Sequence, residues 1–190
     1  VIHLMMTEYE LFPNAPACQD NNDIPESGNG IPDVLDEARW GVEWLMKMQT
    51  EDGGVLRRTE AWGQPSLYTR ADLDTTIMYT YPVSIGSTGN MAATCALAAR
   101  VYQDIDPEFA QTCLDAAKRA YAWLEANPNF VYPYPGNYYG ATTEFIGVSE
   151  KDEVLWAKVE LYAATGDKTY LDGIARLASE EDLTGFSYHE

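Results

Sequence analysis

Apolar residues recur at helical spacing through most of the chain, and Gly, Pro and Asn gather between those stretches. Residues three, four and seven positions apart lie on one face of a helix, so the pattern predicts an all-α domain with long loops. The expected helices cover residues 1–11, 32–49, 85–104, 107–126, 151–165 and 168–178.

Several of these helices carry boundary signals. Pro32 and Asp33 suit the first turn of a helix, and Asp106 followed by Pro107 reads as a capping residue and a first-position proline. Gly166 ends the fifth stretch, as glycine does between the two helices of a hairpin. The expected repeating unit is therefore a pair of antiparallel helices.

Two loops, 50–83 and 127–147, are unusually long and rich in aromatic residues. Long ordered loops in a compact domain are often functional, and exposed rings stack on sugar faces and other flat ligands. The alternative is that these rings only cover helix ends. The rings are Trp62, Tyr68, Tyr79, Tyr81, Phe130, Tyr132, Tyr134, Tyr138, Tyr139 and Phe145.

Charge and cysteine content exclude several classes of function. The chain of 190 residues, enough for one domain, has 12 Lys+Arg against 30 Asp+Glu and a net charge of -18. Nucleic acids and anionic membranes bind clustered cations, so both are poor partners, and no apolar run is long enough to span a bilayer. Three cysteines and two histidines do not suit a disulfide framework or a zinc site, and Cys95 and Cys113 are expected in the core.

Three sequence blocks are more specific than the general pattern. Residues 24–40 read IPESGNGIPDVLDEARW, residues 152–157 read DEVLWA and continue to ELY and ATGD at 160–167, and residues 82–102 lie between them. Together with Thr142-Thr143-Glu144-Phe145, these blocks resemble glycoside hydrolase family 9 over nearly the whole chain.

The resemblance implies a fold and an activity. The fold is an (α/α)6 toroid of antiparallel helical hairpins, of which residues 1–190 form a central part that is incomplete at both ends. A partial toroid exposes apolar seams, which the missing parts of the same catalytic domain or a second copy would cover. The activity is inverting hydrolysis of β-1,4-glucan of the endoglucanase or cellulase type, in a secreted or periplasmic enzyme without a required cofactor.

The same resemblance places both catalytic carboxyl groups outside this chain, one before Val1 and one beyond Glu190, so the chain alone is expected to be inactive. The acidic groups Asp72/Asp74, Asp33 with Asp36/Glu37, and Asp152/Glu153 are expected to be mostly solvated surface charges instead of a replacement catalytic pair. The rival hypothesis is a non-catalytic helical domain that binds carbohydrate or protein. The coding sequence on either side of residues 1–190 would discriminate between the two.

Substrate contacts are expected in the loops, where this chain departs from the family. After Gly53-Gly54-Val55 the family often places an aromatic residue and a histidine, whereas this chain has Leu56, Arg57 and Arg58. Arginine can donate to sugar hydroxyls or pair with a carboxylate, and these two could also only balance an acidic surface. Mixed-linkage glucan, xyloglucan and aminosugar oligomers stay open as substrates. The candidate substrate-binding residues are Arg57, Arg58, Trp62, Tyr138, Phe145 and Tyr188.

The resemblance also implies a structural calcium site, because an acidic pair at this position binds calcium in many family members. Asp152 and Glu153 match that pair, with Ser149, the Gly147 carbonyl and Glu190 as further candidate ligands. The alternative, which we favour from the sequence, is that both carboxylates sit in a helix first turn and stabilise its dipole.

Overall fold

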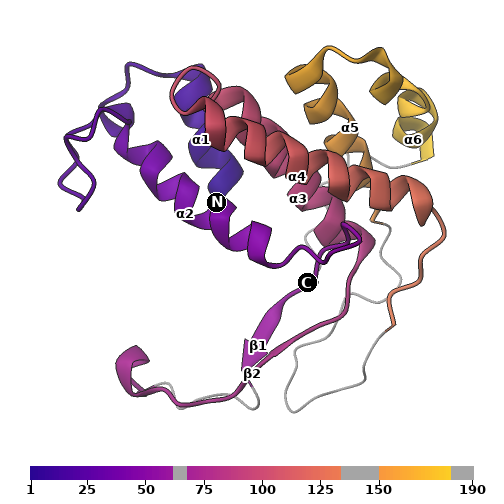
Figure 1. The fold of residues 1–190 in the computed structure, drawn as a ribbon, viewed down its shortest axis with the longest axis horizontal. Coiled ribbons are helices and arrows are strands. Elements are labelled where there is room, and N and C mark those ends of the chain that lie inside the picture. Colours follow the sequence, from indigo (N-terminus) through magenta and orange to yellow (C-terminus); the bar gives the residue numbers. More distant parts are fainter. Residues whose placement is uncertain (62–67, 134–149, 181–190) are drawn as a thin grey trace.

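The protein is described by a computed structural model over residues 1–61, 68–133 and 150–180. Its five longer helices confirm the first five helices expected from the sequence (Figure 1). Their bounds are α1 Ile2–Leu11, α2 Asp33–Lys47, α3 Ile85–Val101, α4 Pro107–Ala126 and α5 Lys151–Thr165. The cap at Asp106 forms as expected, since its side chain accepts the Phe109 N–H at 3.0 Å.

The helix expected over 168–178 is wrong as a single element. A 3-10 helix, η3 (Lys168–Leu171), is followed by a separate short helix, α6 (Ile174–Glu180). Asp167 starts the first by accepting the Thr169 N–H at 2.9 Å, and Gly173 breaks the path with a φ of 78°. A residue in the left-handed region of φ cannot continue an α-helix. The apolar positions therefore keep their helical spacing in the sequence across Gly173, although the backbone turns there.

The loop over 50–83 contains secondary structure that the sequence pattern did not predict. Strands β1 (Thr59–Ala61) and β2 (Met78–Thr80) pair antiparallel, with Thr59 opposite Thr80 and Ala61 opposite Met78. Two short 3-10 helices, η1 (Pro16–Cys18) and η2 (Ala71–Leu73), complete the described elements. Each of these elements has three residues, which is too short for a periodic pattern of apolar positions in the sequence.

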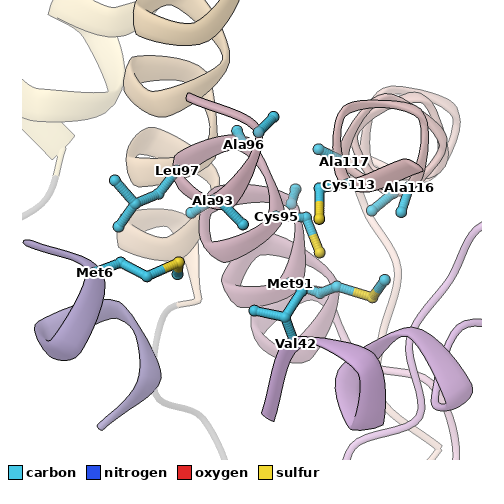
Figure 2. Close-up of a cluster of buried hydrophobic side chains, with 14 of the residues drawn as sticks. Met6, Val42, Met91, Ala93, Cys95, Ala96, Leu97, Cys113, Ala116 and Ala117 are labelled. Atoms are coloured by element: carbon cyan, nitrogen blue, oxygen red, sulfur yellow. The ribbon is translucent and has the colours of Figure 1, made fainter. Parts of the chain in front are cut away.

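Helix α3 is the centre of the core. It is rich in small residues and is buried on nearly all sides, because α1, α2, α4 and α5 pack around it. Figure 2 shows Met6 of α1, Val42 of α2 and Cys113 of α4 gathered around α3. Small side chains let the neighbouring helices approach closely, so a core forms with few large residues.

The three cysteines are buried and free. Burial raises the pKa of the Cys95 thiol to about 12 and also raises that of Cys113. A protonated, inaccessible thiol is a poor nucleophile and metal ligand. The expected core role of Cys95 and Cys113 is therefore confirmed.

Helices α3 and α5 run in the same direction. Gly86 lies against Glu150 and Gly89 lies against Glu153, while about three turns farther along α3 Arg100 pairs with Glu160 at 2.8 Å. Because α3 and α5 are parallel, the two segments that precede them, 50–83 and 127–150, reach the same end of the helices. We call this end the loop face and define it by residues 50–61, 68–83, 127–133 and 150.

Helix α4 runs antiparallel to α3. At the end away from the loop face, Tyr102 packs edge-on against Phe109 with ring centroids 4.9 Å apart. At the loop face, Trp123 and Val83 both lie within van der Waals reach of the position a Gly54 Cβ would occupy. The pair α3 and α4 is thus an antiparallel hairpin, as expected.

Helix α1 exposes apolar side chains. Leu4 is 61% exposed and Leu11 is 63% exposed, and Val1 and Phe12 are also largely exposed. These residues match the expectation of an apolar seam, while the identity of whatever covers it stays a prediction. Among the described residues, no helix combines the length and the apolar character that crossing a membrane requires.

Candidate functional site

The base of the first loop is fixed to the start of α3 by hydrogen bonds. Arg57 donates its N–H to the Pro82 carbonyl at 3.0 Å, and the Ser87 hydroxyl donates to the Arg57 carbonyl at 3.2 Å. Deeper in the core, the Val55 N–H donates to Thr88 Oγ1 at 3.0 Å. The backbone around Arg57 is therefore held on both sides.

The Arg57 side chain crosses from the first loop to the second. Its guanidinium forms an ion pair with Glu150 Oε1 at 2.7 Å, over a separation of 93 residues. The same guanidinium lies over the Tyr132 ring, 4.9 Å from the centroid. Planar arginine suits this combination, since it can pair with a carboxylate and stack on a ring at the same time.

Glycine at position 86 leaves room for this ion pair. Gly86 lies in the first turn of α3, and a Cβ there would be 2.9 Å from Glu150 Oε1. Glu150 is the residue before α5, yet it makes no side-chain cap for that helix. Its carboxylate reaches Arg57 because nothing larger than hydrogen stands at Gly86.

Arg58, the second expected substrate contact, has its contacts within the first loop. It pairs with Glu60 at 3.0 Å and lies 4.3 Å over the Tyr81 ring centroid. Tyr81 is buried, so this ring is not a stacking platform. Both arginines thus pair with carboxylates, one of the two roles expected from the sequence, and sugar contact by either stays a prediction.

The aromatic residues of the loops divide into two groups. Phe130 packs edge-on against the buried Trp123 near the end of α4, with ring centroids 5.0 Å apart, while Tyr81 is buried under Arg58. Tyr68 is 94% exposed and Tyr79 is 43% exposed, which fits stacking on a ligand. Tyr132 is half-buried and lies under the Arg57 guanidinium. The remaining candidates lie outside the described residues: Trp62, Tyr134, Tyr138, Tyr139, Phe145 and Tyr188.

Asp152 and Glu153 lie in the first turn of α5, as the helix interpretation expected. Burial, followed by the hydrogen bond and charge of Asp152, raises the pKa of Glu153 to about 7. Glu153 Oε2 is buried and has no hydrogen-bond partner within the described part of the chain. Glu153 therefore carries less negative charge near neutral pH than an exposed glutamate.

The described residues do not make up a calcium site by themselves. Calcium takes six to eight oxygen ligands, and residues 1–61, 68–133 and 150–180 contain no cluster of three or more His, Cys, Asp or Glu side chains suited to a metal. Gly147, Ser149 and Glu190 lie outside the described residues. The buried Glu153 oxygen is compatible with a cation, and calcium binding by Asp152 and Glu153 stays a prediction.

Asp72 and Asp74, the acidic pair in the first loop, both have partners within that loop. Asp72 pairs with Arg70 at 2.7 Å on the surface. Hydrogen bonds from the hydroxyl and N–H of Thr76 hold the pKa of Asp74 below its usual value. Asp74 is thus held in its ionised form, whereas an acid catalyst needs a raised pKa.

The pair Asp33 and Asp36 organises the turn before α2. The buried Asp33 Oδ2 accepts the Asn22 N–H at 2.5 Å and the Ser27 hydroxyl at 2.8 Å. Asn29 donates to Asp36 Oδ2 at 3.1 Å, while burial raises the pKa of Asp36. The most specific sequence block is thus a turn built around carboxylates.

Asp20 completes this turn from its other side. Its two oxygens accept the N–H groups of Gly28 at 2.5 Å and Gly30 at 2.7 Å, and these hydrogen bonds lower the pKa of Asp20. Both glycines have φ near 90°, at 91° and 92°, a region that disfavours side chains. This explains why glycine stands at both positions.

Sequence reasoning missed Glu150 of the loop face and the two α3 glycines, Gly86 and Gly89, that lie against Glu150 and Glu153. Glu150 looked like one of many surface acids, and its partner lies far away in the sequence. Two glycines three residues apart in the first turns of a helix were the available signal, because isolated helix glycines often have a packing reason.

Comparison with known proteins assigns the family. Residues 1–189 match the sequence profile of glycosyl hydrolase family 9. Endoglucanase D of Acetivibrio thermocellus is 31% identical over 159 residues, which cover 83% of this chain and 25% of that protein. A xyloglucan-specific endo-beta-1,4-glucanase of Bacteroides ovatus is 32% identical over 188 residues, which cover 94% of this chain and 32% of that protein.

Solved structures agree with the sequence relatives. A metagenome-derived family 9 endoglucanase has a TM-score of 0.83 and 37% identity, with 94% of this chain and 32% of that chain covered. The expected fold class, part of an (α/α)6 toroid, is confirmed by this similarity and by the helical hairpins described above. The chain spans a quarter to a third of the length of these two curated relatives. From its sequence profile, its relatives and its fold, the chain belongs to glycosyl hydrolase family 9.

Proposed function

We propose that this chain is part of an inverting glycoside hydrolase that cleaves β-1,4-glucan, of the endoglucanase type. The observation that carries the proposal is the family 9 match over residues 1–189, joined to relatives named as endoglucanases.

The loop face supports a role in binding the glucan. It gathers two long segments at the same end of two parallel helices, and it presents the exposed rings of Tyr68 and Tyr79. Sugar rings have apolar faces that pack on aromatic side chains, while their hydroxyls need polar groups nearby. The loop face offers both kinds of group in one place.

In this proposal the reaction itself uses carboxyl groups from outside residues 1–190. Inversion needs a general acid and a general base roughly 6.5–9.5 Å apart, with water between them. The acidic pairs of the described chain have other roles, in a turn, in local ion pairs and in a helix first turn. The remainder of the same catalytic domain, or a second copy, would complete the toroid.

The substrate class we propose is a β-1,4-linked glucan or its oligosaccharides. The relatives of this chain include proteins named as a xyloglucan-specific endoglucanase and, in Butyrivibrio fibrisolvens, a cellodextrinase. Because Leu56, Arg57 and Arg58 replace the residues common in the family, binding should be compared on cellulose oligomers, mixed-linkage glucan and xyloglucan.

Affinity electrophoresis on these glucans tests the proposal. We expect the 190-residue chain to be retarded by at least one of them, and Tyr79→Ala to weaken that binding about three- to tenfold through lost stacking. Trp40→Ala is the matched control, because Trp40 is an exposed ring on α2, away from the loops.

The same sample should release no reducing sugar, whereas a longer protein that includes the flanking segments should do so. Absence of binding to every glucan contradicts the binding role. A longer protein that binds glucan but does not hydrolyse it favours the non-catalytic alternative.

A further inference from the structure

The ion pair between Arg57 and Glu150 connects the two loops that form the loop face. Arg57 belongs to the segment before α3, and its side chain contacts Glu150 and Tyr132, which belong to the segment before α5. An arginine that binds substrate directly would point its guanidinium at the ligand. Here the guanidinium is directed at the neighbouring loop.

We propose that Arg57 is a positioning residue, which holds the two loops together through Glu150 and so sets the affinity for glucan without contacting the sugar. This inference rests on the proposed function for its glucan readout. The contact between the loops is itself measurable without any ligand.

The surroundings of the ion pair favour a structural effect. The side chains of Arg57 and Glu150 are only 20% and 25% exposed, whereas Arg70 and Asp72 in the same loop are 74% and 59% exposed. Exposed ion pairs contribute little because water screens them, while partly buried pairs are screened less. The ion pair between Arg57 and Glu150 is thus suited to hold the two loops at a fixed distance from each other.

The Arg57 backbone gives the side chain a fixed starting point. Its N–H donates a hydrogen bond to the Pro82 carbonyl, and its carbonyl accepts one from the Ser87 hydroxyl. Pro82 and Ser87 lie on either side of the first residue of α3. Glu150 stands immediately before α5, which is packed along α3. The ion pair therefore links two points that the helices already position, and it closes the connection between the loops.

A fixed connection between the two loops reduces the conformational entropy that the loops lose when a ligand binds. Loops that are ordered before the sugar arrives lose less conformational freedom on binding, so affinity rises without any added contact to the sugar. Arg57, Glu150 and Gly86 act as one unit in this account, because a side chain at Gly86 would displace the Glu150 carboxylate.

A double-mutant cycle on the full chain tests the proposal. Arg57→Gln and Glu150→Gln should each weaken glucan binding about three- to tenfold, the range for loss of a partly buried ion pair. The double variant should be no weaker than either single variant, because one contact is removed in all three. Melting temperatures should stay close to that of the parent chain, since the core does not involve this pair.

Gly86→Ala is the most informative variant. It keeps both charges and leaves Arg57 available to a sugar, yet its Cβ displaces the end of the Glu150 side chain. The expected loss of affinity matches that of Glu150→Gln. Arg70→Gln is the matched control, because it removes the same charge from an arginine of the same loop, whose exposed pair with Asp72 lies within that loop.

Hydrogen exchange gives the readout that needs no glucan. Peptides covering residues 127–133 should exchange faster in Arg57→Gln, Glu150→Gln and Gly86→Ala than in the parent chain and in Arg70→Gln. If only Arg57→Gln weakens glucan binding, Arg57 contacts the sugar and the proposal is wrong. If exchange is unchanged in all three variants, the loops are not connected through this pair, and the proposal fails whether or not glucan binds.

Failure of the proposed function has a different signature. In that case no glucan binds to any form, while the exchange rates still rise in the three variants. Unchanged exchange together with intact glucan binding overturns the positioning role alone.

Discussion

Gly89 of α3 lies against the backbone of Glu153 on α5, so closely that a Cβ at residue 89 would be 2.8 Å from the Glu153 carbonyl carbon. The neighbour is main chain, which cannot move aside without shifting the helix. The spacing of the two parallel helices is therefore set by the absence of a side chain at this position.

Gly89→Ala should destabilise the fold, because the added methyl group forces α3 and α5 apart. Overpacking of this kind costs about 1–3 kcal/mol, and urea unfolding followed by circular dichroism measures it. Gly86→Ala is the control in the same helix, since its Cβ meets the end of the Glu150 side chain, which can move. Equal stability of Gly89→Ala and the parent chain would contradict the close approach.

Glu153 should make the chain less stable as pH rises toward neutrality. Its pKa is raised from 4.5 to about 7 in the folded state, so the folded protein binds this proton more tightly than the unfolded chain does. The contribution is fully present below pH 4.5 and is lost as pH rises through about 7. Urea midpoints measured across this range should fall for the parent chain and fall less for Glu153→Gln.

Calcium would reverse the sign of this effect, because a cation favours the ionised carboxylate. If Asp152 and Glu153 bind calcium, added calcium should raise the urea midpoint at pH 7 and leave Glu153→Gln unchanged. Parallel pH curves for the two proteins without calcium would show that Glu153 is not the titrating group.

Asp33 should stabilise the folded chain mainly by accepting hydrogen bonds and less through its negative charge. Asp33→Ala leaves the Asn22 N–H and the Ser27 hydroxyl without their acceptor and should cost about 2–3 kcal/mol. Asp33→Asn keeps an acceptor oxygen and replaces the buried Oδ1, which has no hydrogen-bond partner among residues 1–61, 68–133 and 150–180, with a donor. We therefore expect it to stay within about 1 kcal/mol of the parent. Chemical unfolding of the two variants side by side decides the point.

A loss as large for Asp33→Asn as for Asp33→Ala would show that the negative charge itself is required. That result would indicate that Asp33 stabilises the turn by pairing with a cation and not by accepting hydrogen bonds.

The exposed leucines of α1 should drive self-association of the 190-residue chain. Leu4 and Leu11 are 61% and 63% exposed, so the variant carrying Leu4→Gln and Leu11→Gln loses little packing and should keep its melting temperature. Light scattering and binding of a hydrophobic dye should both decrease. Met6→Ala is the contrasting variant, because Met6 is buried in the same helix and its truncation should cost about 2–5 kcal/mol.

If the double glutamine variant scatters light and binds dye as strongly as the parent, the α1 side chains are not the source of association.

The long helices could be predicted because each has a periodic apolar pattern and clear boundary residues, as Asp106 and Pro107 show for α4. The break at Gly173 could not, since apolar spacing continues across it while the backbone turns. Strands of three residues leave no pattern of their own, and β1 and β2 form through backbone pairing of segments that meet only after folding.

The loop face was predicted in part. The long aromatic loops and the unusual arginines marked its location, but a sequence does not show which acid an arginine will meet. Glu150 is one of 30 acidic residues, and only the parallel packing of α3 and α5 brings it beside Arg57. The roles of Tyr81 and Phe130 likewise depend on which rings the fold buries.

The pairing of β1 with β2 has a consequence for how substrate preference could be altered. Ala61 and Met78 stand opposite each other, so the segment between them leaves and re-enters the fold at adjacent points. Below that junction, hydrogen bonds to Pro82, Ser87 and Thr88 fasten the chain to α3. A replacement segment of different length or composition could therefore be grafted between Ala61 and Met78, and the helices beneath would not have to adjust.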